Sequence, residues 1–407
     1  MFACPNLVGS FPAAPKLTKF NLNNRLRTHL SYSSGKWFLE VLEDSLLKGN
    51  KRASGVFSSI TEIEIHGCNS LKSCQLDILP HFSKFTITYC LGLESLCILE
   101  GPLLYLHQLV VRRCPNLKSL PENMYSLLPS LEELELSSLP KVYSFPIGRL
   151  PSKLNSLCIR DCIKLNVLSP LLQSLLSLSH FSFGGDGDVK SFSNETLLLP
   201  STLTSLEIHN LRNLKSLDYK VLQHLTSLQN LKICRCPKLE FIQEELLPSS
   251  IEHLEILNLK DPDYKGLQHL TSLRELKIWS SSKLEPIPED VDYKGLQHLG
   301  SLRQLKICGC PKLESVPEEG LPPSLEYLEI GNLENLKSLN YKGLQHLNSI
   351  HHLKIWRCHK LKSMPEQGLP SSLKFLQILD CPSLPKRCKR ETGEDWPMIS
   401  HIPRITI

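Results

Sequence analysis

The stretch LRQLKICGCPKLESVPE, from Leu302 to Glu318, decides how this chain folds. Its first half alternates apolar and polar residues, with Lys306 standing between Leu305 and Ile307. This alternation predicts a β-strand with one buried face, because successive side chains of a strand point to opposite sides. The second half loses the alternation and contains a glycine and two prolines. The stretch therefore predicts a strand, a turn and an irregular return segment.

The same pattern recurs along most of the 407 residues. Its core, L-x-x-L-x-I with close variants, starts at Leu17, Ile60, Phe82, Leu106, Leu131, Leu154, Leu178, Leu203, Leu228, Ile251, Leu273, Leu302, Leu325, Ile350 and Leu373. From Ile60 onward the starts are 22 to 29 residues apart, which is the spacing of leucine-rich repeats. One such unit is too small to bury its apolar face alone, so neighbouring units must stack. We therefore predict an α/β solenoid, a leucine-rich-repeat horseshoe with a concave parallel β-sheet and short helical or irregular convex segments.

The repeats divide the chain into three parts. Residues 60–382 are predicted to be regular repeats, and residues 383–407 a C-terminal tail whose basic cluster is solvated; the cluster consists of Lys386, Arg387, Lys389 and Arg390. Residues 1–59 are predicted to hold a truncated first repeat and degenerate repeats, with a degenerate unit or a short helix around Trp37, Leu39, Leu42, Leu46 and Leu47. The opening CPNL at Cys4 matches CPNL at Cys114, so the chain starts within a repeat. We expect it to be a fragment of a longer protein or a truncated gene product.

A second period lies over the first. The segment Y-K-[GV]-L-Q-H-L begins at Tyr219, Tyr264, Tyr293 and Tyr341. Its leucines, as at Leu267, Leu270 and Leu273, have the three-residue spacing of one tight helical turn that faces the core. Its histidines (His224, His269, His298 and His346) are therefore interpreted as repeat residues on the convex side, and not as a catalytic set.

Positions within a unit are counted from the first residue of L-x-x-L-x-I, so that Leu302 is position one. Many of the 15 cysteines fall at position nine: Cys68, Cys90, Cys114, Cys162, Cys236, Cys310, Cys358 and Cys381. Leucine takes this position in other units, so it is a small to medium buried site, where a free thiol behaves as a small hydrophobe. Thiols of this kind favour a reducing, cytoplasmic (or nucleo-cytoplasmic) compartment. The pairs Cys234/Cys236 and Cys308/Cys310 resemble zinc ligands, but three repeats separate them, about 15 Å at a strand spacing of about 4.8 Å. No metal site, cofactor or catalytic residue is predicted.

Composition and charge exclude other classes of function. The net charge is +5 and charged residues make up 21% of the chain, which is weak evidence for nucleic-acid binding, because acidic residues directly follow the one dense basic cluster, in the C-terminal tail. No uninterrupted apolar run is long enough to span a bilayer. The sequence also lacks a nucleophile elbow, an HExxH motif and a glycine-rich phosphate loop. We expect a protein-binding module, monomeric in isolation, and not an enzyme.

The concave face of the predicted sheet carries the candidate binding residues. Position five of successive strands reads Glu207, Lys232, Glu255, Lys277, Lys306, Glu329 and Lys354. Neighbouring strands bring opposite charges together, so these residues form either a self-compensating ladder of ion pairs or part of a partner site. Large apolar residues stand at positions three and seven, and either form a recognition patch or pack sideways across neighbouring strands. The candidate protein-binding residues are Leu257, Trp279, Tyr327, Trp356, Phe375, Leu379, Lys277, Lys306 and Lys354.

Two features resemble one known family. The pattern C-P-x-L-x-S-L-P-E occurs from Cys114 to Glu122 and, with Val316 for leucine, from Cys310 to Glu318. The closing segment has CPSL from Cys381, then KRC from Lys386, GEDWP from Gly393 and HIP from His401. Together these features resemble the repeat region of plant intracellular nucleotide-binding leucine-rich-repeat (NLR) disease resistance proteins of the coiled-coil class.

The resemblance implies a function in plant defence and innate immunity. In this family the repeats restrain a nucleotide-binding module and sense a pathogen effector or a guarded host protein, which would be the partners here. The chain departs from the family in lacking the G-x-x-x-x-G-K-[ST] loop of that module, so the nucleotide switch is not assigned to it. The alternative is a stand-alone repeat adaptor or decoy, for example a substrate receptor of a ubiquitin ligase.

Overall fold

The computed structural model describes most of the repeat region. The described residues are 61–69, 71–76, 82–99, 101–143, 145, 149–162, 165–185, 189–192, 199–217, 219–239, 247–257, 267–279, 293–310, 313–316 and 321–407, with the backbone alone for 19–23, 31–33 and 36–38. The expectations for Cys4, Leu39, Leu42, Leu46 and Leu47 lie outside these residues. Trp37 lies in β3 (Lys36–Phe38), a short strand antiparallel to β2 (Ser31–Ser33), and not in a helix.

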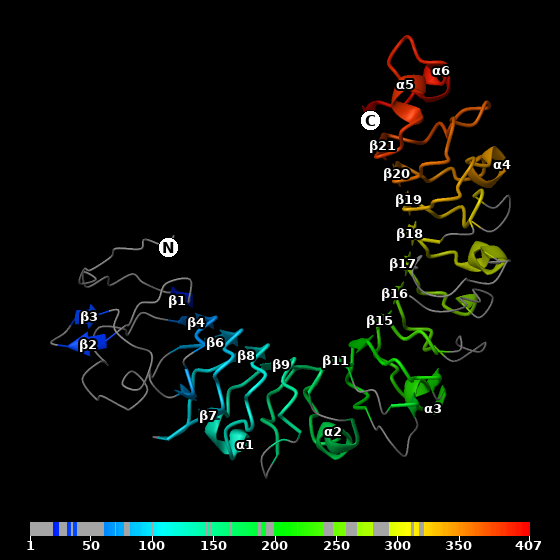
Figure 1. The fold of residues 1–407 in the computed structure, drawn as a ribbon. Helices are drawn as coiled ribbons and strands as arrows, with labels where there is room; N and C mark the ends of the chain where they lie inside the picture. The colour runs from blue at the N-terminus through cyan, green and yellow to red at the C-terminus, as the bar shows by residue number, and fades with distance from the viewer. Residues whose placement is uncertain are drawn as a thin grey trace. The chain divides into compact units, whose positions relative to one another are not determined.

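The predicted parallel-strand solenoid is confirmed. Each described repeat contributes one short strand, and within each of the two units of the chain that strand pairs in parallel with the strand of the next repeat (Figure 1). The chain divides into a first unit, residues 1–186 with 195–203, and a second unit, residues 187–194 with 204–407. The strands of the first unit are β1 (Lys19–Asn23), β4 (Glu62–His66), β6 (Lys84–Thr88), β8 (Gln108–Arg112), β9 (Glu133–Ser137), β10 (Ser156–Arg160) and β11 (His180–Gly184). Those of the second are β13 (Ser205–His209), β15 (Asn230–Cys234), β16 (His253–Leu257), β17 (Glu275–Trp279), β18 (Gln304–Cys308), β19 (Tyr327–Gly331), β20 (His352–Trp356), β21 (Phe375–Leu379) and β22 (Arg404–Thr406).

The register follows directly from the repeat pattern. Position four of one strand lies beside position four of the next, as Leu276 beside Leu305 and Leu328. Positions four and six are buried in these strands, whereas positions three and five alternate with them on the other face. The sheet therefore has a leucine and isoleucine face toward the core and a mixed outward face.

Short helical turns and side ladders form the return segments. The helical pieces are α1 (Met124–Leu127), α2 (Leu165–Leu172), α3 (Tyr219–Gln223), η3 (Tyr293–His298) and α4 (Tyr341–Leu344); the side ladders pair β5 (Ser73–Gln75) with β7 (Ser95–Cys97) and β12 (Ser191–Phe192) with β14 (Ser216–Leu217). The tight turn predicted at Leu267, Leu270 and Leu273 is confirmed, since the N–H groups of Leu270 and Leu273 each bond to the carbonyl three residues earlier and all three side chains are buried. His269 and His346 each bond through Nε2 to a carbonyl of the preceding repeat, at 2.8 Å, which gives them a structural contact.

In the repeats whose position eight the structure describes, a left-handed residue at that position turns the chain at the end of the strand. It is Gly67, Tyr89, Arg113, Ser138, Asp161, Gly185, Asn210, Arg235, Gly309, Asn332, Arg357 or Asp380. The backbone N–H at this position reaches the position-seven carbonyl of the next repeat, for example from Arg113 to Ser137 at 2.8 Å. The turn therefore extends the ladder between repeats by one bond beyond the strand.

The position-nine thiols stabilise the same turn. In most repeats the thiol donates to the carbonyl two residues earlier, as from Cys114 to Arg112 at 3.4 Å and from Cys358 to Trp356 at 3.5 Å. Burial raises the pKa of Cys236 to about 11, so it stays a neutral thiol at physiological pH. The described cysteines are all free, and the packing interpretation of position nine agrees with these contacts.

The C-terminal segment is folded onto the last repeat and is not a solvated tail throughout. It contains α5 (Leu384–Arg387), α6 (Trp396–Ile399) and β22, which pairs with β21. Asp395 is buried, receives two hydrogen bonds from the Arg387 guanidinium at 2.7 and 3.1 Å, and accepts one from the backbone N–H of Met364 at 2.9 Å. The interpretation of the basic cluster as solvated is therefore wrong for Arg387, whereas Lys386, Lys389 and Arg390 are exposed. Among the described helices, none has the length and apolar character needed to cross a bilayer.

We predict that Asp395→Ala destabilises the C-terminal repeat. The substitution leaves the Met364 N–H buried without its acceptor, which costs about 1–3 kcal/mol, and it removes the partner of Arg387. Hydrogen exchange measured by mass spectrometry should accelerate around residue 364. The matched control is Glu366→Ala, which removes an exposed carboxylate two residues from Met364; equal acceleration in both variants would contradict the buried role of Asp395.

Candidate functional site

The outward face of the second unit brings the sequence-predicted binding residues together. Positions three, five and seven of β16 to β21 lie side by side across neighbouring strands, because the register aligns each position with its counterpart. We call this surface the second-unit face. All nine candidate residues belong to it, from Leu257 on β16 to Phe375 and Leu379 on β21.

Charges along position five are only partly compensated by their neighbours. Lys232 pairs with Glu255 at 2.8 Å, and Lys354 pairs with Glu329 at 2.9 Å. Lys277 and Lys306 stand directly beside each other in the register. Both reach the one carboxylate of Glu275, a position-three residue, at 3.0 and 3.1 Å. The predicted self-compensating ladder therefore holds for two pairs, whereas Lys277 and Lys306 share a single negative charge.

The two candidate tryptophans approach each other across the intervening strands. The ring centroids of Trp279 and Trp356 are 6.3 Å apart, although β18 and β19 lie between their strands. Small residues, Cys308 and Gly331, occupy the intervening position seven. A Cβ at Gly331 would stand 2.1 Å from the Trp356 ring, so only glycine leaves room for it. The alternative of sideways packing therefore describes these tryptophans, which remain half-buried on the face.

Glu329 fixes the polar ends of three candidate residues. Its carboxylate accepts hydrogen bonds from the Tyr327 hydroxyl, the Trp356 indole N–H and the Lys354 ammonium, each at 2.9 Å. The residue is only 7% exposed. Burial by itself would raise the pKa of Glu329, but the hydrogen bonds from Lys354 and Tyr327 outweigh it and lower the pKa. The cluster holds the aromatic rings in fixed positions without a bound partner.

A row of rings and cations runs along position three and contains residues that the sequence reasoning missed. The His352 ring lies between Tyr327 and Phe375, with centroid distances of 4.8 and 5.5 Å. Arg404 of β22 lies over Phe375 at 5.1 Å, and Lys306 lies over Tyr327 at 5.6 Å. Burial and the nearby Lys354 lower the pKa of His352. His352 was detectable from its position three, but Arg404 was not, because β22 lies outside the repeat pattern.

Exposure differs strongly among the candidates. Phe375 and Leu379, both on β21, are 37% and 38% exposed, whereas the other candidates are half-buried. The rings that are locked by Glu329 thus form a rigid base, and Phe375 and Leu379 are the apolar side chains most open to a partner. Rigid aromatic anchors beside exposed apolar groups are typical of protein-binding hot spots.

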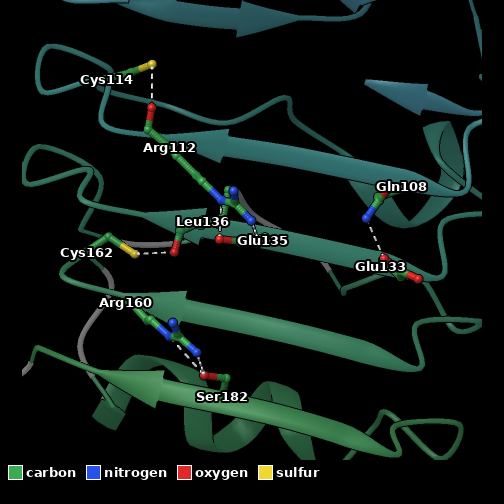
Figure 2. Close-up of polar contacts among 9 residues, drawn as sticks. All are labelled: Gln108, Arg112, Cys114, Glu133, Glu135, Leu136, Arg160, Cys162 and Ser182. Atoms are coloured by element: carbon green, nitrogen blue, oxygen red, sulfur yellow. Dashed lines mark hydrogen bonds and ion pairs between the residues drawn. The ribbon is translucent and has the colours of Figure 1, made fainter. Parts of the chain in front are cut away.

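The corresponding face of the first unit is polar and internally paired. Figure 2 shows Arg112 of β8 in a two-pronged ion pair with Glu135 of β9, with both contacts at 2.5 Å. Arg160 of β10 donates twice to the Ser182 hydroxyl of β11, at 3.0 and 2.7 Å (Figure 2). Arg112 and Arg160 are thus bonded to neighbouring strands, and this face carries no aromatic cluster like that of the second unit within the part of the chain described.

The two cysteine pairs that resemble zinc ligands are buried in separate repeats. Cys234 lies on β15 and Cys308 on β18, with β16 and β17 between them. Burial raises the pKa of Cys234 and that of Cys308 to about 12. The described residues contain no group of three or more His, Cys, Asp or Glu side chains arranged to hold a metal ion.

Comparisons with known proteins find partial similarities. A protein of Arabidopsis thaliana that is named for disease resistance is 32% identical over 145 residues, which are 35% of this chain and 10% of that protein. Among solved structures, the leucine-rich-repeat domain of a type III effector is 20% identical over 62% of this chain and 77% of that chain, with a TM-score of 0.35. An internalin of Listeria monocytogenes is 17% identical over 78% of this chain and 82% of that chain, with a TM-score of 0.36. No family model matches the chain.

The described repeats of this chain form a leucine-rich-repeat solenoid, whose stacked strands present an extended outward surface.

We predict that Glu329→Gln lowers the melting temperature at neutral pH, by an amount equivalent to about 1–3 kcal/mol. A carboxylate with a lowered pKa stabilises the fold above its unfolded pKa, and this contribution is lost as the pH falls through the folded pKa. The difference between wild type and variant should therefore shrink below the ordinary carboxyl value of 4.5. Glu326→Gln, at an exposed pair with Arg303, is the control and should change little at any pH; a pH-independent loss in Glu329→Gln would contradict the charged cluster.

Proposed function

We propose that this chain is the effector-sensing and autoinhibitory repeat region of a plant disease resistance protein, and that the second-unit face is its recognition surface. The observation that carries the surface assignment is the fixed aromatic cluster around Glu329 with Phe375 and Leu379 exposed beside it. The similarity to the Arabidopsis protein supports the assignment to plant defence, over the 145 residues that match.

The chain's own chemistry favours a cytoplasmic protein. Its described cysteines are free and mostly buried, a pattern suited to a reducing compartment. In the family that the sequence resembles, the partners are a pathogen effector or a guarded host protein, and the nucleotide-binding module of the same receptor. The alternative of a stand-alone adaptor or decoy gains no support from the comparisons.

The first test is the transcript upstream of the Met1 codon. We expect an in-frame nucleotide-binding module with a G-x-x-x-x-G-K-[ST] loop, and we expect that module, expressed separately, to co-purify with this chain. A stop codon shortly before Met1 in every transcript, or a module that fails to associate, would contradict the receptor assignment.

A second test addresses the second-unit face. Phe375→Arg combined with Leu379→Arg should abolish a two-hybrid interaction with a secreted pathogen protein that wild type binds, because two charges then stand in the apolar part of the face. Circular dichroism and melting should stay close to wild type, since both side chains are already partly exposed. Leu176→Arg, at an exposed leucine of the first unit, is the control. Interactions that the face variant retains would place recognition elsewhere.

A further inference from the structure

The turns that follow the strands of the first unit carry a second surface, separate from the second-unit face. We call it the first-unit flank and define it by Tyr89, Leu91, Arg113, Lys118, Lys141 and Tyr143. These residues occupy positions eight to thirteen of three successive repeats. Hydrogen bonds connect the repeats here, with the Asn116 side-chain amide donating to the Leu91 carbonyl at 2.7 Å and Lys141 donating to the Asn116 side-chain oxygen at 2.7 Å.

Apolar side chains on the flank are unusually open to solvent. Tyr89, Leu91 and Tyr143 are 41%, 49% and 67% exposed. Leu91 occupies position ten of its repeat, where other repeats have a proline, such as Pro115 and Pro237. Large exposed apolar groups gathered on one surface mark an interaction site more often than isolated ones do.

The backbone at Tyr89 and Arg113 is unfavourable for such large residues. Their φ angles are 58° and 54°, in the left-handed region. Glycine, asparagine or aspartate accepts this conformation more readily and takes the position in many repeats, such as Gly67 and Asn210. Tyr89 is the sole aromatic residue among the left-handed turns of the described repeats. A residue that persists in a disfavoured conformation points to a role beyond folding.

The two residues also hold each other in place. The Arg113 guanidinium lies 4.9 Å from the centre of the Tyr89 ring and donates a hydrogen bond to its hydroxyl. On its other side the Tyr89 ring lies 5.0 Å from the His66 ring. These contacts keep the exposed tyrosine in one orientation, so less entropy is lost when it contacts a partner.

Positive charge dominates the same surface. Positions eight to thirteen of the repeats that begin at Ile60, Phe82, Leu106 and Leu131 contain Lys72, Arg113, Lys118 and Lys141 against the single carboxylate of Glu94. Glu94 pairs with Lys118 at 2.5 Å. Lys118, through a hydrogen bond and its charge, and Lys72 and Lys141, through their charges, all lower the pKa of Glu94. Lys141 bonds to a neutral amide, so its charge is held in position and not neutralised.

We propose that the first-unit flank binds an acidic, leucine-containing segment of a partner protein. Carboxylates of that segment pair with Lys118, Lys141 and Arg113, and its apolar side chains pack on Leu91 and the tyrosine rings. Nucleic acid is the less suitable polyanion, because a protein that binds it through phosphates makes about six to ten such contacts, whereas the flank has three cations, Arg113, Lys118 and Lys141. The proposal is independent of the receptor assignment and of the second-unit face.

The test uses the full chain and a short fluorescent peptide that repeats Glu-Glu-Leu. We expect saturable binding in fluorescence anisotropy, weakened by added salt. Lys118→Gln combined with Lys141→Gln should weaken it at least about tenfold, as loss of two charge-assisted contacts would. The matched control is Lys215→Gln combined with Lys238→Gln in the second unit, where Lys238 bonds to Asn213 at 2.8 Å as Lys141 bonds to Asn116. The control should bind as wild type does.

Tyr89→Asn separates recognition from folding. Asparagine accepts the left-handed backbone, so the variant should melt no lower than wild type while peptide affinity falls about tenfold. A neutral Gln-Gln-Leu peptide should not bind, and Phe375→Ala should bind the acidic peptide normally. The proposal is overturned if the acidic peptide does not bind, if the flank variants leave its affinity unchanged, or if a uridine oligonucleotide of similar length binds more tightly.

Discussion

The structure depends on the burial of each repeat's leucines against the repeats on either side. A unit of 22 to 29 residues has one short strand and a short return segment, which together cannot enclose an apolar core. Stacking solves this by placing every position beside its counterpart, so that Leu276, Leu305 and Leu328 form one continuous row. The same alignment forces outward side chains into rows. Each property of the surface, whether a charge ladder, a ring row or a basic flank, follows from that alignment.

The turn after the strand is where stacking and backbone geometry meet. A left-handed residue directs its N–H to the next repeat, and the following thiol or leucine fills the space beneath it. This arrangement explains why cysteine recurs as a free thiol in the described repeats, since a small apolar group with a weak donor suits the site. It also explains why side chains at position eight project from the edge of the sheet. The arrangement is needed for the fold, but the identity of the exposed residue is not, so that position can carry recognition.

Stability and recognition overlap on the second-unit face. Trp356 contacts Gly331 closely and donates to Glu329, so it contributes to packing as well as to the surface. The two interpretations of the position-seven aromatics, sideways packing and recognition, are therefore compatible: packing fixes the rings, and fixed rings make a better binding surface because less entropy is lost on contact. Phe375 and Leu379 lie at the edge of this rigid area and have fewer constraints.

The sequence by itself determined the strand positions, their parallel register and the buried positions, because the spacing of leucines repeats with the pitch of the solenoid. It also placed Trp279, Tyr327, Trp356 and Phe375 on one face, since a strand alternates its sides with a period of two. Only the tertiary structure decided which of these side chains meet. The approach of Trp279 to Trp356 requires small residues on two intervening strands, and Arg387 meets Asp395 only once the C-terminal segment folds back. Such contacts depend on side-chain directions across repeats, which a linear pattern does not specify. The period of the sequence determines where each residue lies, but the neighbouring residues determine in which direction its side chain points.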